Sequence, residues 1–535
     1  MSETHGNLVN TAVMVRLVLR RDRVRLPVWI AGIVALVVVS AASVSSLYGT
    51  PEKIREYVQL SAGNPTLVAV NGPGIGFESP NVGVVLVNEV SLWGAVACAL
   101  MSVFLVVRHT RAEEEAERVD LLRSGVLGRH APLAATGIVV GAANLAVSLI
   151  AFALVVPLGF PATGTAAFAA VIGLVGLVFT GLAAICAQVF SSARAALGAG
   201  VALVGLAYGI RAAGDVAESP LLWLSPLAWS HRVRAYAGER WWVLALCAAV
   251  AAVAWSIARA LADHRDLGGG LLAQRLGRPD ASGLLSSPIG LAVRLQRGQV
   301  LAWSVGLFVL GLVYGAVGKD VEQMFRDNPD LEEFIQQVTG ASITDSYLSY
   351  TLLLGAMMTG GFAISSVLRL RSEELAGRTE LVLAGPTTRR AWVVGQYLVS
   401  AVGVAVLLAA SGVGTGIGLA VAIGDAGEVP RLLGASMAHL PAVLVLVGVT
   451  AWCQGAVPRW AQAAWLGLGV VVVIGMFGDL LRLPHWVRMV SPLEHVPGLP
   501  AEPLRVLPLV VLSAVALVAA ELGAAAFRRR DVAVT

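Results

Sequence analysis

The sequence contains little charge and almost no lysine. Asp, Glu, Lys and Arg together make up 13% of its 535 residues, about half of the roughly 25% that is usual in soluble domains. The two lysines are Lys53 and Lys319, and neither lies in a G-x-x-x-x-G-K-[ST] loop, whose backbone amides cradle phosphates. The chain therefore lacks a nucleotide-binding loop of this type, and any energy from ATP would have to come from a separate subunit.

Cysteine, histidine and paired-carboxylate sites are not indicated either. The chain has four cysteines, and all of them fall in long apolar runs, where cysteine behaves as a small apolar residue: Cys98, Cys186, Cys247 and Cys453. Its eight histidines are scattered without metal-ligand spacing, and no G-x-S-x-G elbow or carboxylate pair stands out. We expect no disulfide framework, no metal site and no catalytic residues in this chain.

Long apolar runs dominate what is present. Hydrophobic residues make up 57% of the sequence, and runs of 18 or more can cross about 30 Å of hydrocarbon as helices. Twelve such runs occur, near residues 26–47, 89–107, 132–157, 166–190, 195–213, 241–262, 300–317, 348–368, 391–424, 432–455, 460–478 and 504–527. The sequence predicts an all-α polytopic membrane protein whose twelve transmembrane helices form two parallel six-helix repeats.

The arginines indicate the orientation in the membrane. Most of them lie in the N-terminal segment and in the loops that share its side, as the positive-inside rule expects of cytoplasmic segments. Both termini are therefore predicted to be cytoplasmic. The sequence pI near 9.0 then reflects topology, and we expect no nucleic-acid partner.

The two halves are predicted to span residues 1–267 and 291–535, joined by a Gly-rich cytosolic linker at 268–290. Each half ends in a similar basic cluster: Arg259, Arg265 and Asp266 in the first, and Arg528, Arg530 and Asp531 in the second. A Ser-Pro-Leu segment precedes the last span of each half, at 225–227 and 491–493. These segments are interpreted as turns or as re-entrant elements.

A charged loop is duplicated between the halves. Residues 111–131 align without a gap with residues 371–391, and nine of the 21 positions are identical, where unrelated stretches would share about one or two. Apolar helices align easily with one another, but charged loops do not. The repeat therefore indicates a duplicated unit with a duplicated role on one membrane face.

Each copy is predicted to form a short helix that docks on a partner protein. Glu114 precedes Arg118 by four residues, as Glu374 precedes Arg378, which predicts an ion pair along a helix face. A glycine ends each copy, and apolar residues give it a patch that fits a groove. The alternative is a merely solvated loop. The predicted docking residues are Arg111, Glu113, Glu114, Arg118, Asp120, Leu121, Leu122, Gly125, Arg129, Arg371, Glu373, Glu374, Arg378, Glu380, Leu381, Gly385, Pro386 and Arg389.

The run SEELAGRTELVLAGPTTRRAW at 372–392 resembles the coupling-helix loop of type-2 ATP-binding-cassette (ABC) exporter permeases. Over nearly its full length, the chain resembles the fused twelve-helix actinobacterial permeases described as exporters of polyketide antibiotics. The first copy departs from the pattern, with Glu117 in place of Gly377 and Val126 in place of Pro386.

This resemblance implies a permease subunit in the bacterial plasma membrane that exports hydrophobic, antibiotic-like or drug-like molecules. Two ABC-type ATPase subunits, identical or different, would dock on the two coupling helices. ATP and Mg would be bound by those partners, with no cofactor in this chain and no enzymatic activity of its own.

The substrate path is predicted to lie between the halves, along the second and fifth spans of each. Candidate lining residues are polarizable or aromatic: Trp93, Met101, Tyr208, Tyr350, Met357, Met358 and Phe362. Ordinary helix packing is the alternative for each. Asn144, Gln188 and Gln396 are either ligand contacts or helix-to-helix bonds.

Two other functions remain open. An ion-coupled secondary transporter of the major-facilitator type has the same number of helices but needs ionisable residues deep in the membrane. The candidates Glu89, Arg211, Asp425 and Glu521 lie near span ends, where their side chains are expected to reach water. A receptor or scaffold without transport is the third possibility, but it leaves the duplicated loop unexplained.

Overall fold

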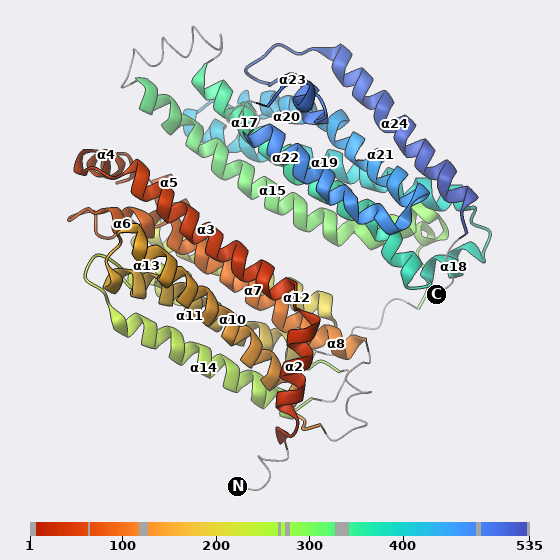
Figure 1. Cartoon of the computed structure of the whole chain (residues 1–535). Helices are drawn as coiled ribbons and strands as arrows, with labels where there is room; N and C mark the ends of the chain where they lie inside the picture. The colour runs from red at the N-terminus through yellow and green to blue at the C-terminus, as the bar shows by residue number, and fades with distance from the viewer. Residues whose placement is uncertain are drawn as a thin grey trace. The chain divides into compact units, whose positions relative to one another are not determined.

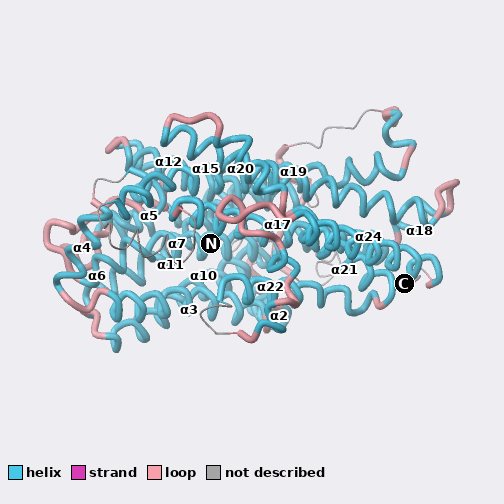
Figure 2. The backbone as a smooth tube through the Cα atoms, turned by 90° about the horizontal axis from the view of Figure 1, so that it is seen from above, coloured by secondary structure: helices cyan, strands magenta, loops and turns pink. Residues whose placement is uncertain are grey.

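The computed structural model describes residues 7–62, 65–116, 127–265, 269–272, 279–326, 342–477 and 483–531. It consists of two compact units, Met1–Gly277 and Arg278–Thr535 (Figure 1). All regular elements in these ranges are helices, joined by loops (Figure 2). Twelve of them are long and apolar enough to cross a membrane, six in each unit. The prediction of an all-α, twelve-span membrane protein is confirmed.

The first unit is built around α11 (Ala162–Val189), which packs against α7 (Leu92–His109), α10 (Ala131–Val155), α12 (Ala193–Val216) and α14 (Trp241–Asp263). The remaining elements are α2 (Thr11–Arg21), α3 (Arg25–Leu47), α4 (Pro51–Ser61), α5 (Pro65–Asn71), α6 (Val82–Leu86), the π-helical η1 (Val87–Ser91), α8 (Arg111–Glu115), η2 (Val156–Leu158), η3 (Pro220–Leu224) and α13 (Trp229–Arg232).

Small residues let the central helices of the first unit approach closely. A Cβ placed on Gly176 would lie 1.9 Å from Asn144 Oδ1, and one on Gly173 would lie 2.1 Å from Ser148 Oγ. A side chain at Gly173 would also lie 2.8 Å from the Asn144 carbonyl oxygen, so glycine is required there, whereas one at Gly176 would displace the Asn144 side chain.

The second span is longer than its apolar run predicts. It begins at Val82 with α6 and continues through η1 into α7, whereas hydropathy places its start near residue 89. The polar residues Asn88 and Glu89 lie in the π-helical segment, where the Tyr57 hydroxyl donates to Asn88 Oδ1 at 2.7 Å and to Glu89 Oε1 at 2.5 Å. These hydrogen bonds allow the helix to extend past its apolar part.

The second unit is organised around α19 (Arg389–Ile423), which packs against α15 (Pro288–Arg326), α17 (Ile343–Leu375) and α20 (Glu428–Met437). Beside it, α21 (Leu440–Ala456) packs along α24 (Val506–Arg529). The other elements are η4 (Gly283–Ser286), α18 (Arg378–Leu383), η5 (Pro458–Ala463), α22 (Ala464–Phe477), α23 (His485–Arg488) and η6 (Pro492–His495).

Part of the predicted linker is held in place by hydrogen bonds. The backbone amides of Leu271 and Leu272 donate to the carbonyl oxygens of Gln188 and Val189 at 3.2 and 3.0 Å. Residues 283–286 form η4, and α15 already begins at Pro288. The glycine-rich composition therefore does not make the whole of 268–290 irregular.

Candidate functional site

The charged residues of the first loop copy converge at one end of the first unit. The Glu114 carboxylate accepts hydrogen bonds from Arg111 Nη1 at 2.8 Å and from Arg265 Nη2 at 2.5 Å. Arg265 Nε also donates to Gln188 Oε1 at 2.5 Å. Arg111 is buried and donates further to the carbonyl oxygens of Ser191 and Gly269. We call Arg111, Glu114, Gln188 and Arg265 the first clamp.

The second unit contains a matching arrangement. Glu374 accepts from Arg530 Nη2 at 2.5 Å and from Arg371 Nη1 at 3.1 Å, and Gln454 Nε2 lies 3.4 Å from its Oε1. The Glu374 side chain is only 2% exposed. These four residues, the second clamp, come from α17, α21 and the segment that follows α24. Each clamp therefore joins the end of the second span to the fourth and sixth spans of its own unit.

A duplicated arginine reinforces each clamp. Arg129 Nη2 donates to the carbonyl oxygens of Ala262 and Asp263 at 3.0 and 2.9 Å. Arg389 Nη1 donates to those of Arg528 and Arg530 at 3.4 and 2.9 Å. These carbonyls lie at or just beyond the C-terminal ends of α14 and α24, where oxygen atoms lack intrahelical donors and a cation is favoured.

The predicted ion pair between Glu374 and Arg378 is wrong. The helix that carries Glu374 ends at Leu375, and Gly377 turns the chain with a φ of 70°. Arg378 Nε donates instead to Glu373 Oε2 at 2.6 Å, and this hydrogen bond raises the pKa of Arg378. The i,i+4 rule does not apply because the helix does not continue between the two residues. In the first copy, Glu113 pairs with Arg21 of α2.

Ten of the predicted docking residues form a buried and an exposed group, whereas Arg371 belongs to the second clamp and Arg129 and Arg389 reinforce the clamps. Arg111, Glu113, Glu114, Glu373 and Glu374 are buried within their own unit. The exposed group lies on and after α18: Arg378, Glu380, Leu381, Gly385 and Pro386. The Leu381 side chain is 78% exposed. Arg118, Asp120, Leu121, Leu122 and Gly125 lie outside the described residues. The solvated part of the second copy is thus a short helix with an exposed leucine, held by a buried clamp.

The candidate residues of the substrate path differ in their exposure. Trp93, Tyr350 and Met358 are 40–47% exposed on the surface of their units. Tyr208 is half-buried, with its ring 6.2 Å from that of Trp93. Packed in the cores of their units are Met101, Met357 and Phe362. For these three, burial favours the packing alternative.

The polar residues inside the spans connect helices. Asn144 Nδ2 donates to Ser102 Oγ at 2.9 Å, and Gln296 Nε2 donates to Gln396 Oε1 at 3.0 Å. Gln188 belongs to the first clamp. All three residues that the sequence left open therefore bond to neighbouring elements. Gln454 was missed, although it lies near the end of the fourth span of its half, as Gln188 does.

Arg211 does not reach water as expected. It is fully buried and donates to the carbonyl oxygens of Val68 and Ala69, at the end of α5, at 3.2 and 2.5 Å. Asp215, four residues later on α12, lies 3.7 Å from Arg211 and 2.8 Å from Arg232. The four-residue spacing of Arg211 and Asp215 is the sequence signal that indicates this pair.

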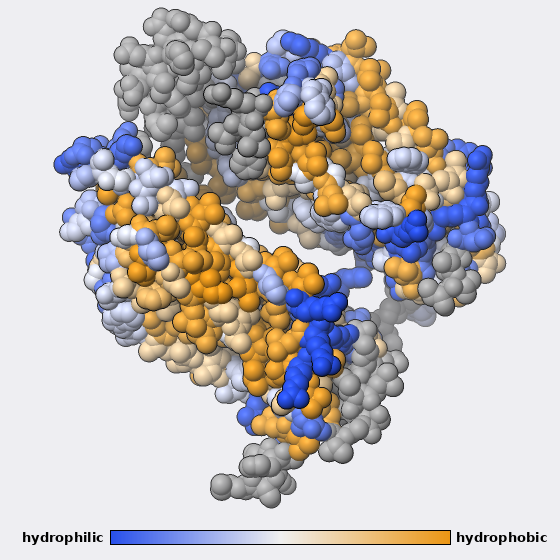
Figure 3. Space-filling view, in the orientation of Figure 1, coloured by the Kyte–Doolittle hydropathy of each residue, from blue (hydrophilic) through white to orange (hydrophobic). Residues whose placement is uncertain are grey.

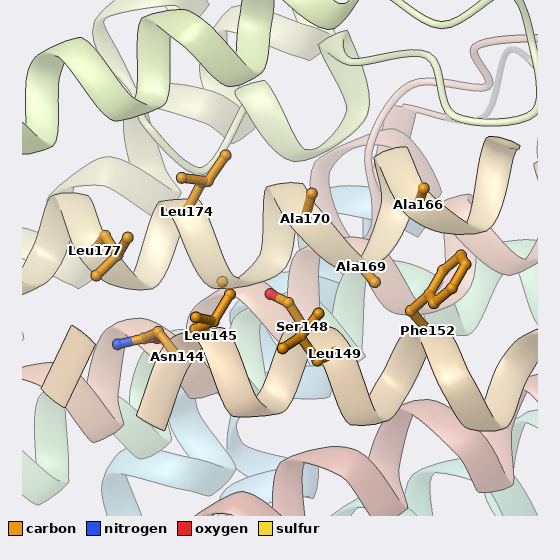
Figure 4. A pocket seen from close by; sticks show the side chains of 11 residues that line it. Asn144, Leu145, Ser148, Leu149, Phe152, Ala166, Ala169, Ala170, Leu174 and Leu177 are labelled. Atoms are coloured by element: carbon orange, nitrogen blue, oxygen red, sulfur yellow. The ribbon is translucent and has the colours of Figure 1, made fainter. Parts of the chain in front are cut away.

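An apolar groove of about 460 Å³ lies between α10 and α11 (Figure 4). Leu145, Leu149 and Phe152 of α10 line it together with Ala169 and Leu174 of α11, and Ala169 points toward Phe152. Leu145 and Leu149 are both 58% exposed, which is expected of side chains that face lipid. Among the described residues, no group of three His, Cys, Asp or Glu side chains is placed to hold a metal ion.

The chain is similar to known efflux permeases. Residues 285–528 match the family model for the C-terminal domain of the multidrug efflux system permease Rv1217c. Over 532 residues the chain is 36% identical to the multidrug efflux system permease protein Rv1217c of Mycobacterium tuberculosis (strain ATCC 25618 / H37Rv), covering 98% of this chain and 96% of that protein. The match covers nearly all of both proteins, and the chain belongs to the family of the multidrug efflux system permease Rv1217c.

Proposed function

We infer that this chain is the permease subunit of an ATP-driven ABC exporter. It lies in a bacterial plasma membrane, with both termini on the cytoplasmic side. The observation that carries this proposal is the duplicated clamp, which ties a charged segment after the second span to the rest of each unit. A permease driven by an external motor needs such a mechanical connection. A transporter driven by an ion gradient has no cytosolic motor to which such a connection would lead.

The cargo is proposed to be hydrophobic, drug-like or antibiotic-like. The relative that covers 98% of this chain is described as a multidrug efflux permease, and the resemblance to polyketide-antibiotic exporters suggests the same chemical class. ATP and Mg would be held by two ATPase subunits, because the chain has no phosphate-binding loop of the P-loop type.

The clamps suggest how force would pass from the motor to the spans. A partner that grips α18 would move the end of α17, and Glu374 would transmit this movement through Arg530 to α24 and through Gln454 to α21. An ATP-bound partner can drive the change only if it favours one arrangement of the permease over the other. A rigid clamp transmits the movement that the partner imposes along the full length of the connected helices.

The experiment introduces a negative charge into the exposed apolar contact on α18. Leu381→Glu should abolish stimulation of ATP hydrolysis in the complex of permease and ATPase, because a carboxylate cannot enter an apolar groove without a partner. The matched control is Leu284→Glu on η4, where the leucine is 59% exposed but lies outside the repeat. Wild-type hydrolysis and export by the Leu381→Glu complex would refute docking through α18.

The second candidate is an ion-coupled transporter, favoured by the buried pair of Arg211 and Asp215. Export driven by a proton or sodium gradient in liposomes that contain this chain alone would support that candidate and overturn the ABC proposal.

A further inference from the structure

A cavity of about 550 Å³ opens at the end of the first unit that carries α8. It lies where α3, α7 and α8 meet the start of α12. Three arginines line it, Arg25, Arg108 and Arg194, and most of the remaining wall is apolar. Such a combination of guanidinium groups and apolar side chains in one cavity fits an amphiphile better than a small ion.

Two of the three arginines have no counter-charge of their own. Arg108 Nε donates to the buried Asp22 at 3.1 Å, so its charge is compensated. Arg25 and Arg194 are exposed, and neither has a hydrogen bond or ion pair with any of the described residues. The nearby Glu115 carboxylate is engaged by the backbone N–H of Ala193 at 2.9 Å. This neutral N–H does not cancel the charge of Glu115, but Arg25 and Arg194 together outweigh it, so the described residues around the cavity carry a net positive charge.

The apolar wall is formed by two stacked rings. The centroids of Trp29 and Phe104 lie 6.1 Å apart at an interplanar angle of 28°, and the Phe104 side chain is 42% exposed. Both residues belong to membrane spans, within about one helical turn of the arginines at the span ends. Figure 3 shows hydrophilic side chains gathered over α2, beside the hydrophobic surface over α3. Arginines at span ends beside aromatic rings are typical of the boundary between headgroups and acyl chains in a bilayer.

We propose that this cavity binds an anionic phospholipid. The headgroup phosphate is held by Arg25 and Arg194, and an acyl chain lies against Trp29 and Phe104. Basic cavities between membrane helices are known to take anionic headgroups. The apolar wall excludes free phosphate as the main ligand, and the uncompensated charge disfavours a zwitterionic lipid. None of the four residues of the first clamp lines the cavity, although Ala112 directly follows Arg111. Lipid retention is measured without an ATPase partner, so its failure is distinguishable from a failure of the proposed coupling.

The test is lipid retention by the full-length protein, measured by native mass spectrometry. Dioleoyl phosphatidylglycerol is titrated against dioleoyl phosphatidylcholine, which has the same chains. The wild type should retain one phosphatidylglycerol more tightly than phosphatidylcholine. Arg25→Gln with Arg194→Gln should weaken this binding roughly thirtyfold, equivalent to about 2 kcal/mol for two basic residues. The double lysine variant keeps the charge and should keep most of the affinity.

The control is Arg259→Gln on α14, an exposed arginine that has no partner among the described residues and lies outside the cavity. This variant should retain phosphatidylglycerol as tightly as the wild type does. Equal affinity in the double variant, equal retention of phosphatidylcholine, or full displacement of the lipid by inorganic phosphate would overturn the proposal. If the double variant has a lower melting temperature in detergent micelles than the wild type, the single variants are compared instead, and each should bind phosphatidylglycerol about fivefold more weakly.

Discussion

Replacing Glu374 by glutamine should loosen the second clamp. The carboxylate is 2% exposed and neutralises Arg530, which is 16% exposed, and Arg371, which is 24% exposed. Removing one partner of a buried ion pair costs about 3–5 kcal/mol because the other charge is left uncompensated. Both guanidinium groups retain some water, so we expect about 2–4 kcal/mol of local stability to be lost. The matched control is Glu521→Gln: that carboxylate pairs with Arg390 at 3.2 Å, both side chains are about 60% exposed, and such a pair contributes under about 1 kcal/mol.

The assay is hydrogen exchange of the last turns of α17 and α24 in detergent, read by mass spectrometry. Glu374→Gln should accelerate exchange there, and Glu521→Gln should leave it nearly unchanged. A double-mutant cycle with Arg530→Gln should give a coupling energy of about 0.5–3 kcal/mol, as for residues in direct contact. If the helix ends exchange hydrogen at the same rate in the Glu374→Gln and Glu521→Gln variants, or if the double-mutant cycle shows no coupling, the clamp does not hold these helix ends together.

Three further predictions concern packing and protonation. Burial lowers the pKa of His231 to about 3, against about 6.5 in an unfolded chain, so its stabilising contribution is complete above pH 6.5 and is lost as the pH falls. The free energy of unfolding, measured with denaturant, should therefore fall by about 2 kcal/mol between pH 7.5 and pH 5. His231→Gln should remove that part of the pH dependence. Gly455→Ala should destabilise the contact of α21 with α24 by about 1–3 kcal/mol, because the new Cβ would lie 2.2 Å from the Gly523 carbonyl oxygen. Its control is Gly467→Ala, whose Cβ meets open space and should not lower the melting temperature. Arg211→Met should remove one donor from each of the Val68 and Ala69 carbonyl oxygens, which keep the Gly72 amide and the Tyr208 hydroxyl. We expect a loss of about 1–3 kcal/mol in total, and limited proteolysis should then cleave near residues 65–71 faster; unchanged cleavage would contradict that capping role.

Sequence alone determined the architecture and the duplication. Hydropathy is a local property, so twelve apolar runs predict twelve spans wherever the helices end up. The repeat of charged positions between 111–131 and 371–391 likewise marked the segments that the clamps later contain. The mirrored arginines Arg265 and Arg530 were visible at the ends of the two halves.

Tertiary structure decided which of these charges meet. Glu374 and Arg530 are 156 residues apart, and no local spacing rule could pair them, whereas the pair that such a rule favoured, Glu374 with Arg378, is interrupted by the turn at Gly377. Burial was decided in the same way: Met358 is exposed and Met357 is packed in the core, although they are adjacent in a uniformly apolar run. The physical reason is that a side chain's partners depend on where helix ends and faces come together, and this is set by packing among helices that are distant in sequence.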